Sequence, residues 1–526
     1  MELYSLQFAI FLGSSLVATY ALRRLAPRWQ WVALLASSLV FYCLEGGGST
    51  LLYLVGCALV TWAAPLGFQR LDERCRCLRS QAADRAQRKA VKVRFARAKR
   101  LVLVLALLAC FGVLAYLKYW NALLYQVGAA TSPTSLGLLL PLGISFYTFQ
   151  SVSYLIDAYQ GKFEPQRNFA KHLLFVSWFP QILQGPINRY DELAPQLLDP
   201  QTPAADQVDR SILLFGYGLI KKYAIANLTV SVIAKIFSHV TPAIPGSAVG
   251  FGILLYSAQQ YGDFSGGIDM VEAVSELYGI RMAPNFRRPY LSVSLADFWR
   301  RWHISLGRWM RDYVFFPLAL TRPMRTLGKW GEAHLGRHVG RTLPACIANI
   351  VVFVIVGVWH GPQAHYLAWG LYNGIVIAMA DLLRPATDAL AHALRVRRES
   401  GGYHAFQVVR TFLVVNLGWY FDRIYDFGDS LLCLRNTFMH FKPQALVPFL
   451  DAAGLTSAGV WGLWIAGVAC AFVLVVSLYE EAGHDVRAAV LSSNVVTRWF
   501  LYTAVCLMLA MAMALGSGGG FMYANF

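Results

Sequence analysis

Residues 101–124 read LVLVLALLACFGVLAYLKYWNALL, an apolar stretch of the length that a helix needs to cross a bilayer. Similar apolar stretches recur along the chain, at 6–22, 51–68, 347–358, 461–478 and 500–515. Only 14% of the 526 residues are charged, whereas a soluble domain carries about 25%. The sequence therefore predicts an all-α, polytopic transmembrane helical bundle of about 10 to 12 spans, with re-entrant or interfacial helices besides.

Residues 70–100 lie between two of these stretches and are strongly basic. They contain twelve Lys or Arg and three Asp or Glu, in a chain whose net charge is +17. Short basic loops beside spans stay on the cytoplasmic side, so we expect 70–100 to be a basic cytoplasmic loop and the N-terminus to lie outside. Nucleic-acid binding is the weaker interpretation, because the run is flanked by membrane segments on both sides.

The first apolar stretch and the cysteines exclude two further readings. Glu2 precedes residues 6–22, and Arg23 and Arg24 follow them, which is the charge order of a first span rather than of a cleaved signal. The nine cysteines are scattered and show no paired CxxC spacing. We therefore expect neither a structural zinc site nor a disulfide framework, and no metal.

The region 133–289 is too polar for helices that simply face lipid. Polar side chains lie in or beside apolar stretches broken by Pro and Gly, namely Gln150, Asp157, Gln181, Gln184, Asn188, Gln259, Gln260, Asp263 and Asp269. Such residues persist at membrane depth only where protein or water surrounds them. We expect a water-accessible cavity or re-entrant segments here, and the number of spans in this region stays open. No internal repeat or linker is visible, so a single domain is expected across 1–526.

The segment 294–317, SLADFWRRWHISLGRWMRDYVFFP, predicts an amphipathic helix. Ser294 followed by Asp297 resembles a capping box, so the helix is expected to begin there. Its apolar face would consist of residues at three- and four-residue spacing, namely Trp299, Trp302, His303, Leu306 and Trp309. This helix either anchors at the membrane interface through its Trp and Arg residues or presents His303 at the entrance of a cavity. Both interpretations stay open.

The segment 347–361, IANIVVFVIVGVWHG, is an apolar helix with one titratable side chain, His360, close to its end. An ionisable residue at membrane depth is costly and indicates function by default. Low polarity disfavours the imidazolium form, so the ring is expected to be neutral and able to accept a proton from a hydroxyl. The alternative is a structural histidine bonded to a backbone carbonyl.

Six tracts, in order along the chain, resemble the membrane-bound O-acyltransferase family, and specifically its bacterial branch with the alginate O-acetyltransferase and the D-alanyl transferase of teichoic acid. They are PLGISFYTFQSVSYLIDAYQG from Pro141, WFPQILQGPINRY from Trp178, YGDFSGGIDM from Tyr261, PNFRRPYLSVSLADFWRRWHISLGRWMRDYVFFPL from Pro284, VWHG from Val358 and FMYANF from Phe521. Two of them depart from the family. YGDFSGGIDM has glycine pairs where alginate-type members show an aromatic residue and a serine, and FMYANF departs from the usual aromatic-rich ending.

The resemblance implies a bundle that encloses a tunnel, with His360 as the catalytic residue and His303 as the second functional histidine. We interpret His360 as the general base that deprotonates an acceptor hydroxyl, and His303 as the residue that positions the acyl donor or polarises its carbonyl. Candidate substrate-binding residues are Trp299, Arg300, Arg301, Trp302, Asp297, Trp359, Asp263, Gln184 and Asn188. Arg300, Arg301, Arg308 and Arg311 either attract a donor phosphate or serve as interfacial anchors.

The implied activity is transfer of an acyl group, with acetyl as the first choice, from a cytoplasmic thioester donor to a hydroxyl of an extracytoplasmic polysaccharide or partner acyltransferase. The donor would be acetyl-CoA or an acyl carrier protein, with no bound cofactor, and the protein would lie in the bacterial cytoplasmic membrane. D-alanyl transfer to teichoic acid is the second choice. A transporter of an envelope polymer is the non-enzymatic alternative, but neither paired carboxylates nor repeated broken helices are evident.

Overall fold

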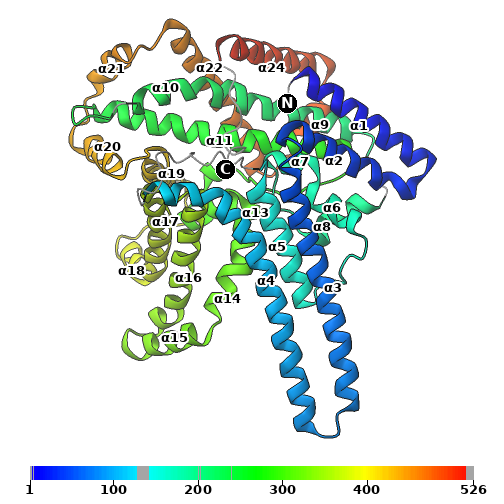
Figure 1. Ribbon diagram of the computed structural model, residues 1–526. Helices are drawn as coiled ribbons and strands as arrows, with labels where there is room; N and C mark the ends of the chain where they lie inside the picture. Colours follow the sequence, from blue (N-terminus) through cyan, green and yellow to red (C-terminus); the bar gives the residue numbers. More distant parts are fainter. Residues whose placement is uncertain are drawn as a thin grey trace. The chain divides into compact units, whose positions relative to one another are not determined.

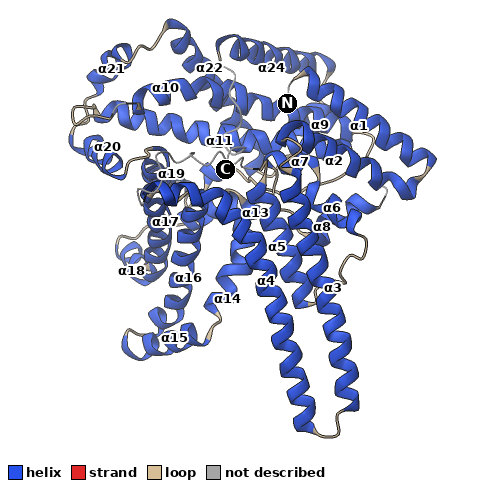
Figure 2. Ribbon diagram, viewed as in Figure 1, coloured by secondary structure: helices blue, strands red, loops and turns tan. Residues whose placement is uncertain are grey.

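The computed structural model describes residues 3, 5–126, 141–199, 201, 203–238 and 240–516. Within these ranges all regular elements are helices and no strand occurs, which confirms the all-α prediction (Figure 2). By its contacts the chain divides into two compact units. Of the described residues, the first holds the chain up to Ile212 together with Met270–Ala283, and the second holds Leu213–Asp269 and 284–516. One domain across 1–526 stays a prediction, and the FMYANF tract lies outside the described residues.

The first unit is built from helices that bury aromatic residues, and its first helix begins at a capping side chain. Ser5 accepts a hydrogen bond from the backbone N–H of Phe8 at 3.1 Å, which satisfies a free donor of the first turn. The elements are α1 (Leu6–Leu25), η1 (Pro27–Trp29), α2 (Gln30–Gly46), α3 (Leu51–Gln81), α4 (Arg85–Gln126), α5 (Ile144–Gln160), α6 (Phe169–Ser177), α7 (Phe179–Gln184), α8 (Tyr190–Leu198) and the first part of α9 (Gln207–Leu219). Of these, α5 is buried along most of its length.

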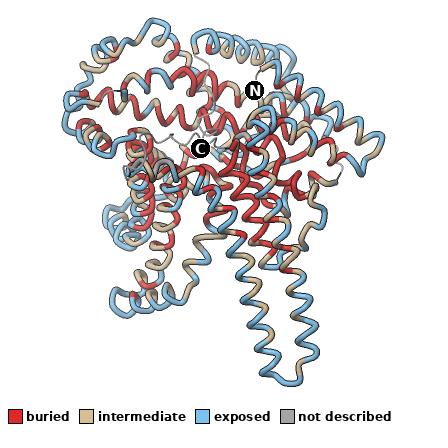
Figure 3. Tube along the Cα trace, viewed as in Figure 1, coloured by how far each residue is buried: buried red, intermediate tan, exposed pale blue. Residues whose placement is uncertain are grey.

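The basic stretch 70–100 is helical rather than an irregular loop. Helices α3 and α4 pack against each other as a long antiparallel hairpin whose turn lies at residues 82–84 (Figure 1). Arg, Lys, Ala and Gln dominate the stretch and are strong helix formers, so both helices continue beyond their apolar halves. The tip is exposed on all sides (Figure 3). Its cytoplasmic location stays a prediction.

The second unit holds the remaining elements, and the boundary between the units falls within α9 and α11. They are η2 (Ile220–Asn227), α10 (Leu228–Phe237), α11 (Gly246–Leu277), η3 (Pro289–Leu291), α12 (Leu295–Arg301), α13 (Ile304–Met310), η4 (Arg311–Phe315), α14 (Phe316–Ala319), α15 (Arg322–His334), α16 (Arg337–His360), α17 (Ala364–Leu382), α18 (Arg384–Ala393), α19 (Gly401–Arg423), α20 (Phe427–Met439), η5 (Pro443–Ala445), α21 (Leu446–Ala452), α22 (Ser457–Glu481), α23 (Val486–Ser492) and α24 (Val495–Leu515).

Six helices in the described ranges are long and apolar enough to cross a membrane: α1, α3, α4, α16, α22 and α24. Each contains one of the six apolar stretches recognised in the sequence. A bent pair, α17 with α18 at 57°, raises the number to seven. The expected 10 to 12 spans exceed the six or seven that meet these criteria in the described ranges.

Helix α16, which ends in the VWHG tract, packs closely against α17. A Cβ atom at Gly357 would lie 2.4 Å from the carbonyl oxygen of Tyr366, and one at Gly370 would lie 2.4 Å from that of Phe353. Membrane helices associate through such small residues because their backbones can approach. The close packing fixes the end of α16, and therefore His360, against the start of α17.

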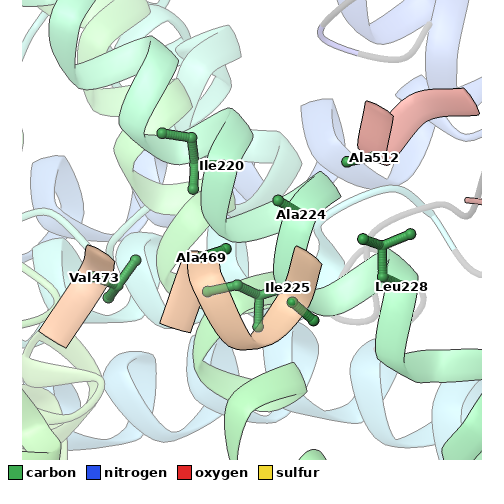
Figure 4. Packing of buried hydrophobic residues seen from close by; sticks show 8 residues of the cluster. Ile220, Ala224, Ile225, Leu228, Ala469, Val473 and Ala512 are labelled. Carbon is green, nitrogen blue, oxygen red and sulfur yellow. The ribbon is translucent and has the colours of Figure 1, made fainter. Parts of the chain in front are cut away.

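A second packing centre lies where η2, a π-helical segment, meets α22 and α24. Small and branched side chains fill it, namely Ile220, Ala224, Ile225, Leu228, Ala466, Ala469, Val473 and Ala512 (Figure 4). Two of the membrane-length helices are thereby joined to the segment that carries Lys221 and Lys222.

Candidate active site

The segment 294–317 begins as a helix but does not continue as one. The Ser294 hydroxyl accepts a hydrogen bond from the backbone N–H of Asp297 at 3.1 Å, and α12 starts at Leu295 as expected. It ends at Arg301. Trp302 is extended, and His303 has a left-handed backbone with φ +48° and ψ +52°. The prediction of one amphipathic helix across the segment is therefore wrong, because the chain breaks at His303 itself.

Tertiary pairing with an upstream strand-like segment causes this break. The N–H of Arg287 donates to the carbonyl of Arg301 at 2.9 Å, and the N–H of Ile304 donates to the carbonyl of Asn285 at 2.9 Å. Between these bonds, Phe286 and Trp302 form an antiparallel bridge. A left-handed residue other than glycine costs about 1–2 kcal/mol, so such a backbone persists only where surrounding bonds fix it.

The His303 side chain is held in one tautomer. Its Nδ1 lies 3.1 Å from Oδ1 of Asn285, and that oxygen also accepts from the backbone N–H of Ser305 at 3.2 Å. A backbone N–H only donates, so the Asn285 atom is the acceptor and Nδ1 of His303 carries the hydrogen. Burial lowers the pKa of His303 to about 3. The ring is therefore neutral near pH 7, and its Nε2 is an acceptor nitrogen.

His360 is the last residue of α16 and is buried among aromatic rings. Its imidazole centroid lies 4.9 Å from that of Trp359, 5.1 Å from Trp369 and 5.7 Å from Tyr366. Gly361 ends the helix, and a Cβ atom there would lie 2.8 Å from the ring of Tyr366. The glycine of the VWHG tract thus lets this tyrosine ring stack beside His360.

Trp359 connects the two histidines. Its ring centroid lies 6.3 Å from that of His303 and 4.9 Å from that of His360. Trp299 lies near His360 through one intermediate ring, because it packs 5.5 Å from Trp369, which in turn contacts His360. The structure therefore brings together four of the residues predicted from the two motifs: His303, His360, Trp299 and Trp359.

A cavity of about 340 Å³ opens beside His303. One wall is α16, and the other is the chain from α12 through η4. The lining is mostly apolar and includes His303, Trp299 and Trp302 together with three arginines, Arg300, Arg308 and Arg311. The Arg300 and Arg311 side chains are 71% and 56% exposed. The site thus combines an apolar interior, a basic rim and a buried imidazole, and neither Trp359 nor His360 is part of this lining.

Three other predicted residues belong to structural networks. Trp302 is buried and packs between rings that include Phe286 at 5.1 Å. Arg301 pairs with Asp297 at 3.1 Å and with Glu481 of α22 at 2.9 Å. Asp297 and Arg301 do not line the cavity, so their charges hold α12 in place instead of facing a substrate there.

Asp263 forms a buried ion pair with Lys222 of η2. Their side chains are 5% and 2% exposed, and a second pair, Lys221 with Asp269 at 2.7 Å, lies on the same two elements. The residue after Asp263, Phe264, places its ring edge-on to His303 at 4.8 Å. Asp263 therefore stands behind the site and does not line the cavity.

Gln184 and Asn188 belong to the first unit. Asn188 donates to Gln181 at 3.0 Å and accepts from the backbone N–H of Ala283 at 2.8 Å, so its side chain is used structurally. Gln184 is fully buried, and its carboxamide makes no hydrogen bond within the described part of the chain. Their roles in substrate binding stay predictions.

The chain is similar in sequence to known proteins. A sequence model described as MBOAT, the membrane-bound O-acyltransferase family, matches residues 166–329. A probable alginate O-acetylase of Pseudomonas aeruginosa is 32% identical over 73% of this chain and 69% of its own length. The chain belongs to the membrane-bound O-acyltransferase family. Acyl transfer is therefore its class of reaction, and with six candidate spans it is a multi-pass protein of the bacterial cytoplasmic membrane.

Two further relatives of this O-acyltransferase show the range of the similarity. A probable alginate O-acetylase of Pseudomonas syringae pv. tomato is 34% identical over 60% of this chain, and the match spans 56% of that relative. The teichoic acid D-alanyltransferase of Bacillus subtilis is 32% identical over 45% of this chain and 58% of its own length. The chain thus matches little more than half the length of these two relatives.

The sequence interpretation missed Asn285 and the two lysines of η2. Asn285 stands 18 residues before His303, and no spacing rule connects a carboxamide in a loop to a histidine at a helix break. Lys221 and Lys222 did carry a signal, because two adjacent lysines stand among apolar residues in GYGLIKKYAIANL. A buried lysine needs an acidic partner, and Asp263 and Asp269 are two of the three acidic residues in the polar set of 133–289.

Proposed function

We propose that this protein transfers an acetyl group from a cytoplasmic thioester donor to a hydroxyl of an extracytoplasmic polysaccharide or of a partner acyltransferase. The names of the Pseudomonas relatives support O-acetylation of an envelope polymer. The chain covers more of the Pseudomonas aeruginosa relative than of the teichoic acid D-alanyltransferase, so D-alanyl transfer is the second candidate.

One observation carries the proposal: two imidazoles flank a single tryptophan, and one of them lines an apolar cavity with a basic rim. A thioester donor with a phosphate has an apolar arm and an anionic end, which match the interior and the rim of this cavity. The acyl carbonyl would then lie near His303, and the acceptor hydroxyl would approach from the side of His360.

His360 is proposed as the general base. A neutral imidazole takes the proton of the acceptor hydroxyl as its oxygen attacks the thioester carbonyl. The carbon–sulfur bond then breaks, and the imidazolium returns the proton to the leaving sulfur, which departs as a thiol. The products are an O-acyl ester and the free thiol, so no oxidant or metal is required. The rings of Trp359, Tyr366 and Trp369 around His360 exclude water from this step.

Of the two roles expected for His303, the tautomer favours positioning. Polarising a carbonyl needs a hydrogen-bond donor, but Nδ1–H is used on Asn285 and the neutral Nε2 only accepts. In the proposed mechanism Nε2 accepts a hydrogen bond from an N–H or O–H group of a substrate and so orients it beside the cavity.

Mass spectrometry of envelope polymers from cells with and without this gene tests the proposal. Loss of an acetyl mass from one polymer is the expected result, and loss of an alanyl mass would replace the acetyl assignment with D-alanyl transfer. Purified protein should also consume acetyl-CoA in the presence of that polymer. A purified, folded protein that consumes no acyl thioester at all would contradict acyl transfer and favour transport of the polymer.

A further inference from the structure

One polar side chain, Asn349, stands within the otherwise apolar run 347–358 of α16 and lines the cavity beside His303. It shares this wall with Val352, Phe353 and Val356, which follow Asn349 by three, four and seven residues and so form one face of the helix. Its carboxamide makes no hydrogen bond to the residues that the structure describes. Asn349 is only partly buried, so its carboxamide is accessible from the cavity and can hydrogen-bond a polar group of a ligand there.

The two walls of the cavity run side by side. Helix α16 extends from Asn349 to Val356, seven residues or roughly 10 Å, and then reaches Trp359, whose ring faces His303. The opposite wall extends from His303 through Gly307 and Arg311 to Phe315, and η4 and α14 pack against α16. Helix α15 then joins α14 to the start of α16 (Figure 1). His303 therefore lies toward the Val356 end of the cavity, and Asn349 lies toward the opposite end.

The chemistry of the lining selects one class of ligand. The arginines Arg300, Arg308 and Arg311 favour a phosphate, although Arg300 also pairs with Asp297 at 3.3 Å and Arg311 with Asp312 at 3.1 Å. The apolar walls favour methylene groups. Asn349 offers both a donor and an acceptor, the pair that an amide group requires. A phosphate, an aliphatic arm with amides and a reacting thioester occur together in a phosphopantetheine thioester.

We infer that Asn349 is a specificity residue that hydrogen-bonds an amide of the pantetheine arm of the acyl donor. The inference rests on the proposed function. The arm is peptide-like, and its two amides lie within about 10 Å of the sulfur when it is extended. That reach matches the length of helix between the level of His303 and Asn349. Coenzyme A and an acyl carrier protein share this arm, so both sources of donor would use the same contact.

The test is a double-mutant cycle between protein and ligand. Full-length protein in neutral-lipid nanodiscs is titrated calorimetrically with coenzyme A and with analogues in which one pantetheine amide N–H at a time is replaced by a methylene group. Asn349→Leu, which is nearly isosteric, should weaken binding of coenzyme A by roughly 3–10-fold, the loss of one hydrogen bond. It should not weaken binding of the analogue that lacks the contacted amide. Val352→Leu, on the same wall, should affect all ligands equally and controls for steric effects.

Two results would overturn the assignment. In the first, Asn349→Leu protein with an unchanged melting temperature binds coenzyme A as tightly as wild type does. In the second, the affinity of this variant falls by the same factor for coenzyme A and for every analogue. A carrier protein bearing phosphopantetheine is titrated in parallel. Tighter binding than that of coenzyme A would identify a carrier protein as the source of the donor, and weaker binding would identify coenzyme A. Because binding is measured without turnover, absence of acyl transfer by wild type would contradict the proposed function and leave this cycle able to decide the role of Asn349.

Discussion

Nδ1 of His303 donates to Oδ1 of Asn285 across 3.1 Å at the one place where the chain between α12 and α13 turns left-handed. The same carboxamide oxygen accepts from the hydroxyl of Ser305 at 2.8 Å. Asn285 therefore fixes the backbone after the histidine and the tautomer of the histidine together. Substitutions at His303 act on the fold through the backbone as well as on the chemistry through the ring.

Replacing His303 by asparagine should separate these two effects. Asparagine tolerates the left-handed conformation, whereas alanine in the same place is strained by about 1 kcal/mol. We expect His303→Asn to fold nearly as stably as wild type, His303→Ala to melt at a lower temperature, and both to lose acyl transfer about 10–100-fold. Melting curves in detergent and an acetyl-CoA consumption assay measure the two effects. Equal stability of both variants would argue against the left-handed backbone.

Protonation of His303 should weaken the fold in acid. Its pKa is lowered from 6.5 to about 3 by burial, so between these pH values the unfolded chain binds a proton that the folded chain does not. Stability contributed by this group is therefore lost as pH falls below about 6.5. On moving from pH 7.5 to 4.5, wild type should lose about 2–3 kcal/mol more than His303→Asn. The free energy of unfolding is measured by chemical denaturation at both pH values. Equal losses in wild type and His303→Asn would show that the imidazole is not buried in its neutral form.

His360→Ala should reduce acyl transfer by about 10²- to 10⁴-fold, the usual contribution of a general base. Donor binding should be nearly unchanged, because the base acts on the acceptor hydroxyl and His360 does not line the cavity. Transfer and donor binding are measured separately on protein that elutes as a single species. Wild-type transfer rates in this variant would remove His360 from the mechanism.

Breaking the buried pair of Lys222 and Asp263 should destabilise the protein strongly. Lys222→Met leaves the Asp263 charge buried without its lysine and should cost about 3–5 kcal/mol, and adding Asp263→Leu should recover most of the loss. The exposed pair of Arg398 and Asp388, 2.7 Å apart, is the control. Arg398→Met should change stability by less than about 1 kcal/mol. Unfolding in detergent measures all four proteins, and a double variant no better than the single one would refute the pairing argument.

The tip of the α3–α4 hairpin should face the cytoplasm, because twelve basic residues outweigh three acids beside two spans. Cys77 is exposed and Cys75 is partly exposed at this tip. In a variant without the other seven cysteines, an impermeant thiol reagent should label them only in opened cells. Labelling of intact cells would reverse the topology and with it the side from which the donor enters.

Features encoded by periodicity or by composition were predictable from the sequence. The six apolar stretches all lie in membrane-length helices, and the VWHG histidine sits at the end of a long apolar helix as expected. The start of α12 was also predictable, since a capping box is a local signal within four residues. The composition of 70–100 favours helix, whereas its charge alone predicts only a basic cytoplasmic loop.

Features that depend on distant partners were not predictable. The break at His303 results from pairing with residues 285–287, and no local pattern distinguishes it from a helix with Trp and His at three- and four-residue spacing. Arg301 looked available for a substrate, but Glu481, 180 residues away, engages it. Asn349 was hidden for the opposite reason, because one carboxamide hardly changes the hydropathy of an apolar run.

The left-handed backbone at His303 also constrains how this position can evolve. Glycine, asparagine and aspartate adopt such a conformation with little strain, whereas β-branched residues do so at high energy. Descendants that lose the imidazole while keeping the fold should therefore accumulate asparagine or glycine there, and reversion to histidine would need no change elsewhere in the backbone. The backbone conformation therefore limits which residues can replace His303, independently of their effect on catalysis.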